Sequence, residues 1–436
     1  MRSTSRHFVY LALCVACLGN ALADSHTTPD SVIHAGTLLA VPGEPPRKEQ
    51  SILISGNRIV SVVDGFVDPS DFDDAQLIDL SDQFVLPGLM DMHVHLTGEL
   101  SPTSRTEALF MSTTMNALRG AHFAAKTLRA GFTTVRDLGA KPEAIFALRD
   151  AIKEGYVDGP RVFAAGSAIA ATGGHGDIDG YKAELLELWT PDTICDGPID
   201  CRRATRHAIK YGADWIKVTA TGGVLSDTAT GTDQQMTDDE LREIVETAHT
   251  LGVKVAAHAH GTDGINAALR AGVDSVDHGT FLDKESIRLF KQSGAYLVPT
   301  LLPGARIPQT MEGNPFFTEA IKAKANAAST ASLDNVRLAY EAGVKIAFGT
   351  DSAVTPHGLN GEEFALMVKA GMSEMDAIYS ATVAAASLLD QSDDLGTIEA
   401  GKLADIIAVD GNPLENISVL ERVATVIKDG RLIATE

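Results

Sequence analysis

Residues 86–95 read Leu86-Pro87-Gly88-Leu89-Met90-Asp91-Met92-His93-Val94-His95, a short apolar run that ends in two histidines one residue apart. Side chains two positions apart along a β-strand face the same side. His93 and His95 therefore point in the same direction, and two converging imidazoles are suited to a cation such as Zn²⁺. By itself this pair is a weak signal, because two solvated or hydrogen-bonded histidines give the same pattern.

This run is the first of a series of short apolar segments that alternate with longer, alanine-rich helical segments between residues 87 and 395. The alternation predicts an α/β fold, and eight such units fit a TIM (β/α)8 barrel with insertions. A doubly wound sheet is the alternative, but no Gly-x-Gly-x-x-Gly motif follows the first strand. The expected strands are 89–95, 133–137, 161–166, 215–219, 253–258, 275–278, 296–300 and 345–351. Expected helices include 237–251, capped by Thr237 with Glu240, and 264–271.

Both ends of the chain differ from this middle. Short strand-like runs with turn signals such as Gly56-Asn57 occupy residues 24–86 and return in residues 396–436. Such dipeptides between apolar runs are typical of β-hairpins. We therefore expect a distorted barrel over residues 87–395 and a small β-sandwich domain formed from both termini.

Three further strand ends carry a side chain that can bind a metal, namely His258, His278 and Asp351. The carboxyl ends of the strands of a TIM barrel all meet on one face, where the active sites of this fold lie. These three side chains would therefore meet His93 and His95. The recurrence at several strand ends predicts a metal site.

Lys217 lies in the fourth expected strand and would also point into the barrel. A cation beside a divalent metal is repelled, so the lysine would be a neutral amine or would pair with an acidic residue. Alternatively, its amine has reacted with CO2 to give an anionic carbamate, whose two oxygens can bridge two metals. Burial favours this reaction because it lowers the pKa of a lysine.

The motifs around these residues resemble the amidohydrolase superfamily, from about residue 31 to the C-terminus. The lysine in the fourth strand, the segment 171–176 and the 20-residue interval between His258 and His278 resemble its imidazolonepropionase-like branch. That branch includes prolidase-like and Xaa-Arg/Lys dipeptidases and ochratoxin-hydrolysing carboxypeptidases. The matching motifs are Pro87-Gly88-Leu89-Met90-Asp91-Met92-His93-Val94-His95, Trp215-Ile216-Lys217-Val218, Ala257-His258-Ala259-His260-Gly261, Asp277-His278-Gly279, Gly349-Thr350-Asp351-Ser352 and Gly396-Thr397-Ile398-Glu399-Ala400-Gly401-Lys402-Leu403-Ala404-Asp405-Ile406.

The resemblance implies a site with two divalent metal ions, usually zinc, that share a hydroxide. Asp351 would take the proton from the bridging water and pass it to the leaving amine. The implied ligands are His93, His95 and Asp351 for one metal, His258 and His278 for the other, and a carboxylated Lys217 between them, with His175 and His260 as substrate contacts.

The implied activity is hydrolysis of peptide-like amide bonds in dipeptides or N-acyl amino acids, with ochratoxin A, a phenylalanine amide, as a candidate substrate. Acidic loops favour basic or neutral substrates. Two alternatives remain open. One is a cyclic-amide hydrolase or deaminase like imidazolonepropionase, with a single metal, and the other is a non-catalytic periplasmic binding protein. The resemblance also implies a homo-oligomer.

Composition and the N-terminus place this chain among exported globular proteins. Its 44% hydrophobic content allows a large core, and its net charge of -22 disfavours a nucleic acid partner. Two arginines before the apolar run 8–18, with small residues at 21–23, predict a signal peptide over residues 1–23 and a periplasmic or secreted protein. The run is too short for stable membrane insertion as an anchor. A lipoprotein signal at Cys14 or Cys17 is the other alternative.

Removal of the signal peptide leaves two cysteines, Cys195 and Cys201, around a Gly-Pro turn. In an oxidising compartment a pair this close can form a disulfide, which we expect here over two free thiols. A zinc site would need more cysteines or histidines nearby, and only His207 is close in sequence.

Overall fold

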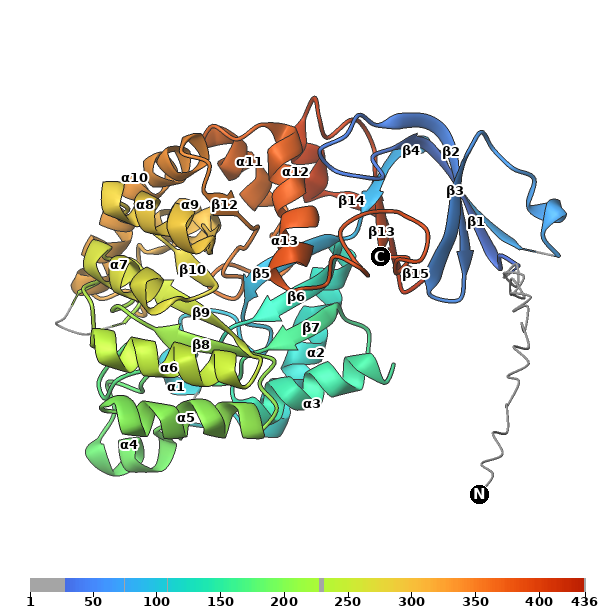
Figure 1. The fold of residues 1–436 in the computed structure, drawn as a ribbon. Coiled ribbons are helices and arrows are strands. Elements are labelled where there is room, and N and C mark those ends of the chain that lie inside the picture. Colours follow the sequence, from blue (N-terminus) through green and yellow to red (C-terminus); the bar gives the residue numbers. More distant parts are fainter. Residues whose placement is uncertain (1–27, 74, 108, 227–230, 435–436) are drawn as a thin grey trace, which may run out of the picture.

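The computed structural model describes residues 28–73, 75–107, 109–226 and 231–434. An α/β barrel forms the larger part, and a β-sheet lies at one side of it (Figure 1). The predicted signal peptide at residues 1–23 lies outside the described residues. None of the helices within the described ranges combines the length and the hydropathy that a membrane crossing requires.

Both ends of the chain contribute strands to the β domain, as the sequence predicts. The two parts join where β4 pairs antiparallel with β13, with Ile406 opposite Pro87. Buried apolar side chains such as Ile33 and Ile427 pack together against this sheet. All its strands are hydrogen bonded into one sheet. In order across that sheet they are β15 (Arg431–Ile433), β14 (Val423–Lys428), β13 (Ile406–Val409), β4 (Gln76–Pro87), β1 (Ser31–Leu38), β2 (Arg47–Ser55) and β3 (Arg58–Asp64).

All eight predicted barrel strands are present, and paired neighbours run parallel. The group β5 to β7 and the group β8 to β12 are connected by single bridges, Ile169 with Val218 and Val94 with Ser352. These bridges close the distorted barrel that the sequence predicts. The strands are β5 (Leu89–Val94), β6 (Phe132–Asp137), β7 (Arg161–Ala164), β8 (Trp215–Thr219), β9 (Lys254–Ala259), β10 (Ser275–His278), β11 (Tyr296–Val298) and β12 (Lys345–Ile346).

The last two barrel strands are shorter than predicted. β11 ends at Val298 and β12 at Ile346, and beyond them Thr300, with a φ of 47°, and Asp351, with a φ of 56°, lie outside the extended region. The predicted strands 296–300 and 345–351 therefore end in loops that carry these residues toward the barrel axis.

Helices pack around the outside of the barrel (Figure 1). The predicted cap of α6 is confirmed, because the Thr237 hydroxyl accepts from the Glu240 amide and the Glu240 carboxylate accepts from the Thr237 amide. Helix α7 begins at Thr262, two residues before the predicted start, with Gly261 as its N-cap. The helices are α1 (Ser104–Glu107), α2 (Thr113–Arg129), α3 (Pro142–Lys153), α4 (Ala183–Trp189), α5 (Pro198–Lys210), α6 (Asp238–Thr250), α7 (Thr262–Ala271), α8 (Lys284–Ser293), α9 (Leu301–Thr310), α10 (Glu319–Glu341), α11 (Glu362–Lys369), α12 (Glu374–Ser380) and α13 (Val383–Leu388).

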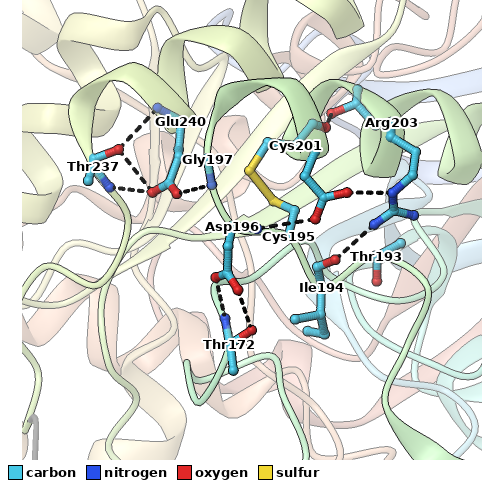
Figure 2. The surroundings of a disulfide bond; sticks show 12 residues. Thr172, Thr193, Ile194, Cys195, Asp196, Gly197, Cys201, Arg203, Thr237 and Glu240 are labelled. Carbon is cyan, nitrogen blue, oxygen red and sulfur yellow. Dashed lines mark hydrogen bonds and ion pairs between the residues drawn. A yellow bond between two sulfur atoms is a disulfide. The ribbon is translucent and has the colours of Figure 1, made fainter.

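Cys195 and Cys201 form a buried disulfide, as predicted, with Cα atoms 5.0 Å apart (Figure 2). It connects the loop before α5 to the first turn of that helix. The next residue, Asp196, accepts hydrogen bonds from the Thr172 amide at 3.2 Å and from the Thr172 hydroxyl at 2.7 Å. The cross-link therefore supports the start of the glycine-rich loop that carries His175.

We expect the double variant Cys195→Ala/Cys201→Ala to lose about 2 kcal/mol of unfolding free energy, because a disulfide across a short loop restricts the unfolded chain. Urea denaturation measures the loss. Reductant should shift the wild-type midpoint toward that of the variant and leave the variant unchanged. Equal midpoints for the oxidised wild type and the variant would contradict a stabilising role.

Candidate metal centre

The side chains that the sequence singles out gather at the carboxyl ends of the barrel strands. Four of them lie on β5, β8, β9 and β10, and the others lie in loops that follow a strand. All of them line one cavity of about 460 Å³. The residues brought together are His93, His95, His175, Lys217, His258, His260, His278 and Asp351.

The imidazole rings lie close enough to one another to share bound ions. The ring centroid of His278 is 5.0 Å from that of His93 and 4.6 Å from that of His258. Ligand atoms of His258, His260 and His278 lie within 4.8 Å of one another, and so do those of His93, His278 and Asp351. These two overlapping groups offer donors for two neighbouring cations.

The group of His258, His260 and His278 includes a residue, His260, that the sequence predicts to contact substrate. Its ring stacks on His278 with centroids 4.7 Å apart. The geometry therefore gives His260 a second possible role as a third imidazole beside His258. Its contact with substrate stays a prediction.

Asp351 lies near both His93 of β5 and His95, which directly follows that strand. Its Oδ1 is 3.2 Å from His95 Nε2 and 3.5 Å from His93 Nε2. Both Asp351, with a φ of 56°, and His278, with a φ of 71°, adopt the left-handed conformation that residues with side chains rarely take. Backbone strain of this kind is concentrated at functional sites.

Burial keeps most of these imidazoles neutral. It lowers the pKa of His93, His258 and His278 well below the usual value. It also lowers the pKa of His260 to about 3 and that of His175 to about 4. A metal ion binds only the neutral ring, so these histidines need not lose a proton to bind one near pH 7.

Hydrogen bonds at Nδ1 orient four of the rings, and Nε2 of one of them, His95, lies beside Asp351. A fixed partner on the second ring nitrogen is typical of metal-binding histidines. The contacts are His95 with the Gly139 carbonyl (2.8 Å), His260 with the Thr280 hydroxyl (2.7 Å), His278 with the Thr300 hydroxyl (2.7 Å) and His175 with the Ser226 hydroxyl (2.5 Å).

Two ring nitrogens are buried without a hydrogen-bond partner, His93 Nδ1 and His258 Nε2. A buried polar atom that stays unsatisfied costs free energy. A cation beside His258 would satisfy its free nitrogen. Together with the carboxylate of Asp351, the neutral imidazoles make a donor set that fits zinc.

Lys217 pairs with an acidic residue, one of the states that the sequence left open. Its Nζ lies 2.5 Å from Asp277 Oδ2, and His93 Nδ1 lies 3.5 Å from the same oxygen. The other oxygen, Oδ1, accepts a hydrogen bond from Arg136 Nη2 at 3.2 Å. Burial lowers the pKa of Lys217, although the Asp277 carboxylate acts in the opposite direction.

Two buried residues close to the predicted ligands, Arg136 and Asp277, were not predicted from the sequence. Arg136 is fully buried, its Nε donates to the Met92 carbonyl at 2.7 Å and its guanidinium lies 4.5 Å from the Trp215 ring centroid. Two features of the sequence could have pointed to these residues. Asp277 directly precedes His278, and Arg136 is a charged residue within the second predicted strand.

Asp91, within the first quoted stretch, is also buried. It accepts hydrogen bonds from the His93 amide at 3.0 Å, the Thr350 hydroxyl at 2.6 Å and Asn360 Nδ2 at 2.8 Å. Burial raises the pKa of Asp91 to about 6, although these hydrogen bonds favour its charged form. The carboxylate thereby joins β5 to the loop that ends in Asp351.

We expect Asp277→Asn to lower the free energy of unfolding by about 3–5 kcal/mol, because Arg136 would stay buried without its counter-charge. Chemical denaturation measures the loss. The matched control is Asp150→Asn, which removes the exposed partner of Arg149 at 2.9 Å and should cost about 1 kcal/mol or less. Equal, small losses in the two variants would contradict a structural role for the buried pair.

Comparisons with known proteins identify the family of this chain. Residues 84–433 match the amidohydrolase family. Ochratoxinase from Aspergillus niger is 33% identical over 431 residues, which cover 94% of this chain and 88% of ochratoxinase. The crystal structure of a Xaa-Pro dipeptidase with methionine in its active site is 44% identical with a TM-score of 0.88, and the match covers 93% of this chain and 100% of that one. A prolidase complexed with N-methylphosphonate-L-proline is 31% identical with a TM-score of 0.84 over 93% of this chain and 100% of that one. This chain therefore belongs to the amidohydrolase family, as its motifs predict, and is a hydrolase that acts on amide bonds.

Proposed function

We propose that this protein is an exported enzyme with two metal ions that hydrolyses dipeptides or N-acyl amino acids, as a dipeptidase or carboxypeptidase. The observation that carries the proposal is the convergence of neutral imidazoles, Asp351 and Lys217 in one cavity. The similarity to a Xaa-Pro dipeptidase and to ochratoxinase supports peptide-like amides, with ochratoxin A among them.

The proposed cofactors are two zinc ions. His93, His95 and Asp351 would hold one, and His258 and His278 would hold the other. When bound, such ions lower the pKa of a shared water and polarise the carbonyl of the substrate.

Lys217 is proposed to be carboxylated and to lie between the two ions. A neutral amine attacks CO2, forms one N–C bond and releases one proton. The carbamate nitrogen keeps one N–H, which can still donate to Asp277 Oδ2, now 2.5 Å from Nζ. The hydrogen bond to Asp277 can therefore persist in the modified lysine, while the positive charge of the ion pair is lost and Arg136 remains the cation beside Asp277.

The other side chains position the substrate and move protons. Asp351 lies on the cavity and is 15% exposed, so it can accept a proton there and deliver it to the leaving amine. His175 and His260 are held at Nδ1 by hydroxyl groups, which leaves Nε2 of each ring for the substrate carbonyl. Apolar side chains such as Leu225 and Ile307 exclude water from the cavity walls.

The disulfide supports export. Structural disulfides persist in oxidising compartments and are rare in the cytosol. The buried Cys195–Cys201 bond is consistent with the signal peptide expected at residues 1–23 and with a periplasmic or secreted enzyme. Assembly into a homo-oligomer stays a prediction.

We expect Asp351→Asn to lower kcat by roughly 10²- to 10⁴-fold, since the amide can neither accept nor deliver the proton. Release of free amino acid from Xaa-Pro, Xaa-Arg and Xaa-Lys dipeptides, N-acyl amino acids and ochratoxin A measures the activity. Asp150→Asn, far from the cavity, should retain it. Full activity of the Asp351 variant would refute the assigned role, and no hydrolysis of any substrate by the wild type would favour a binding protein.

We expect Lys217→Ala to bind fewer metal ions per chain than the two proposed for the wild type, because the bridging ligand is lost. Elemental analysis of the purified proteins gives this number. Lys254→Ala is the matched control, since Lys254 also lies on a barrel strand but contacts the Leu388 carbonyl and Asp390 instead. A wild type with one metal that hydrolyses cyclic amides would favour the imidazolonepropionase-like alternative.

A further inference from the structure

The charge of the cavity differs from that of the whole chain. The sequence has 58 acidic and 36 basic residues. Among the described residues that line the cavity, however, Asp351 is the only acidic one, and it belongs to the proposed metal site. Two lysines line the same cavity, Lys217 and Lys141. Apart from the metal ligands, the cavity therefore presents a positive charge to its substrate.

Lys141 is held beside the metal site by its backbone. It is the N-cap residue of α3, and its side chain caps no amide of that helix. Two residues earlier, the Gly139 carbonyl lies 2.8 Å from Nδ1 of His95. The Ala140 amide donates to the Gly166 carbonyl at 3.1 Å. The backbone just before Lys141 is therefore hydrogen bonded to His95, a proposed metal ligand.

Lys141 is an exposed residue and forms no ion pair with a described residue. A neighbouring hollow, which Lys141 also lines, contains Glu99 and Glu107. Glu107 pairs with Arg119 at 2.6 Å, and Glu99 accepts from the His357 amide at 2.8 Å. A second neighbouring hollow, also lined by Lys141, contains Glu143 and Asp192. None of these acidic residues forms an ion pair with Lys141, so its charge is available to a ligand.

We propose that Lys141 binds the free α-carboxylate of the substrate's C-terminal residue, and that the cavity prefers an uncharged side chain on that residue to a basic one. An ammonium group binds a carboxylate through charge-assisted hydrogen bonds. The apolar walls suit an apolar side chain, and no acidic residue among the described lining is left to pair with an arginine or lysine of the substrate. The sequence predicts basic or neutral substrates, and this inference restricts them to substrates with an uncharged C-terminal side chain. The inference rests on the proposed function.

The test uses Ala-Pro, Ala-Phe and Ala-Arg, each as the free acid and as the C-terminal carboxamide. The wild type should cleave the free acids of Ala-Pro or Ala-Phe with higher kcat/KM than Ala-Arg. Lys141→Ala should raise KM for the free acids by about tenfold or more, with kcat changed much less, because a charged hydrogen bond is lost. KM for the carboxamides should stay the same.

Two further variants separate charge from structure. Lys141→Arg should restore low KM for the free acids, and Lys141→Glu should raise it further than Lys141→Ala does. Lys153→Ala, an exposed lysine at the other end of α3, should leave all constants unchanged. Thermal denaturation shows whether each variant is folded.

The outcomes distinguish this inference from the function on which it rests. If the wild type hydrolyses none of these substrates nor the N-acyl amino acids, the proposed function fails. If the wild type is active and Lys141→Ala changes KM for free acids and carboxamides equally, or for neither, the carboxylate-binding role of Lys141 fails alone. A wild-type preference for Ala-Arg would overturn the proposed side-chain preference.

Discussion

Asp277 is a carboxylate with no exposed surface, and its neutralisation inside the barrel organises the site around it. Desolvating such a charge is costly unless cations and donors surround it. Arg136 from β6 and Lys217 from β8 contact its two oxygens, and His93 from β5 lies nearby. The Asp277 side chain, which comes from β10, therefore connects β10 with β5, β6 and β8. The position of Lys217, and with it the gap that two ions would occupy, depends on this contact.

Several residues that line the cavity are buried, and two of them, His278 and Asp351, have a strained backbone. Burial lowers the pKa of His93, His258 and His278 and so favours their neutral rings, which need less hydration than charged ones, whereas the Asp351 carboxylate contributes to the raised pKa of His95. His278 and Asp351 have left-handed backbones, and both of their side chains line the cavity. Contacts from Asp91 and from the Thr300 hydroxyl hold these loops in place. These contacts orient His278 and the loop that carries Asp351, and fixed side chains are what precise metal ligation requires.

Much of the fold and of the candidate site could be predicted because the signals are local. The two-residue period of a strand places His93 and His95 on the same face of the first strand. Because the carboxyl ends of all the strands of a TIM barrel lie on one face, His258, His278 and Asp351 are expected beside them. The disulfide was predictable because its cysteines are six residues apart.

The parts that escaped prediction depend on contacts between distant segments. The Arg136–Asp277 pair joins residues 141 positions apart and follows from the register of neighbouring strands, which the sequence does not display. β11 and β12 are shorter than predicted, and the left-handed backbone of Thr300 and Asp351 beyond them is not visible in the pattern of apolar residues. The composition of the cavity lining, with Lys141 and no described acidic residue besides Asp351, was also hidden, since net charge describes the whole chain and not the few side chains that face a ligand.

The central claim is that two divalent cations lie side by side among these ligands. Anomalous diffraction from crystals of the purified protein, recorded on both sides of the zinc absorption edge, tests it directly. The account predicts two peaks in the cavity, one near His93, His95 and Asp351 and the other near His258 and His278, with Lys217 between them. A single peak, or none in the cavity of an active enzyme, would contradict it.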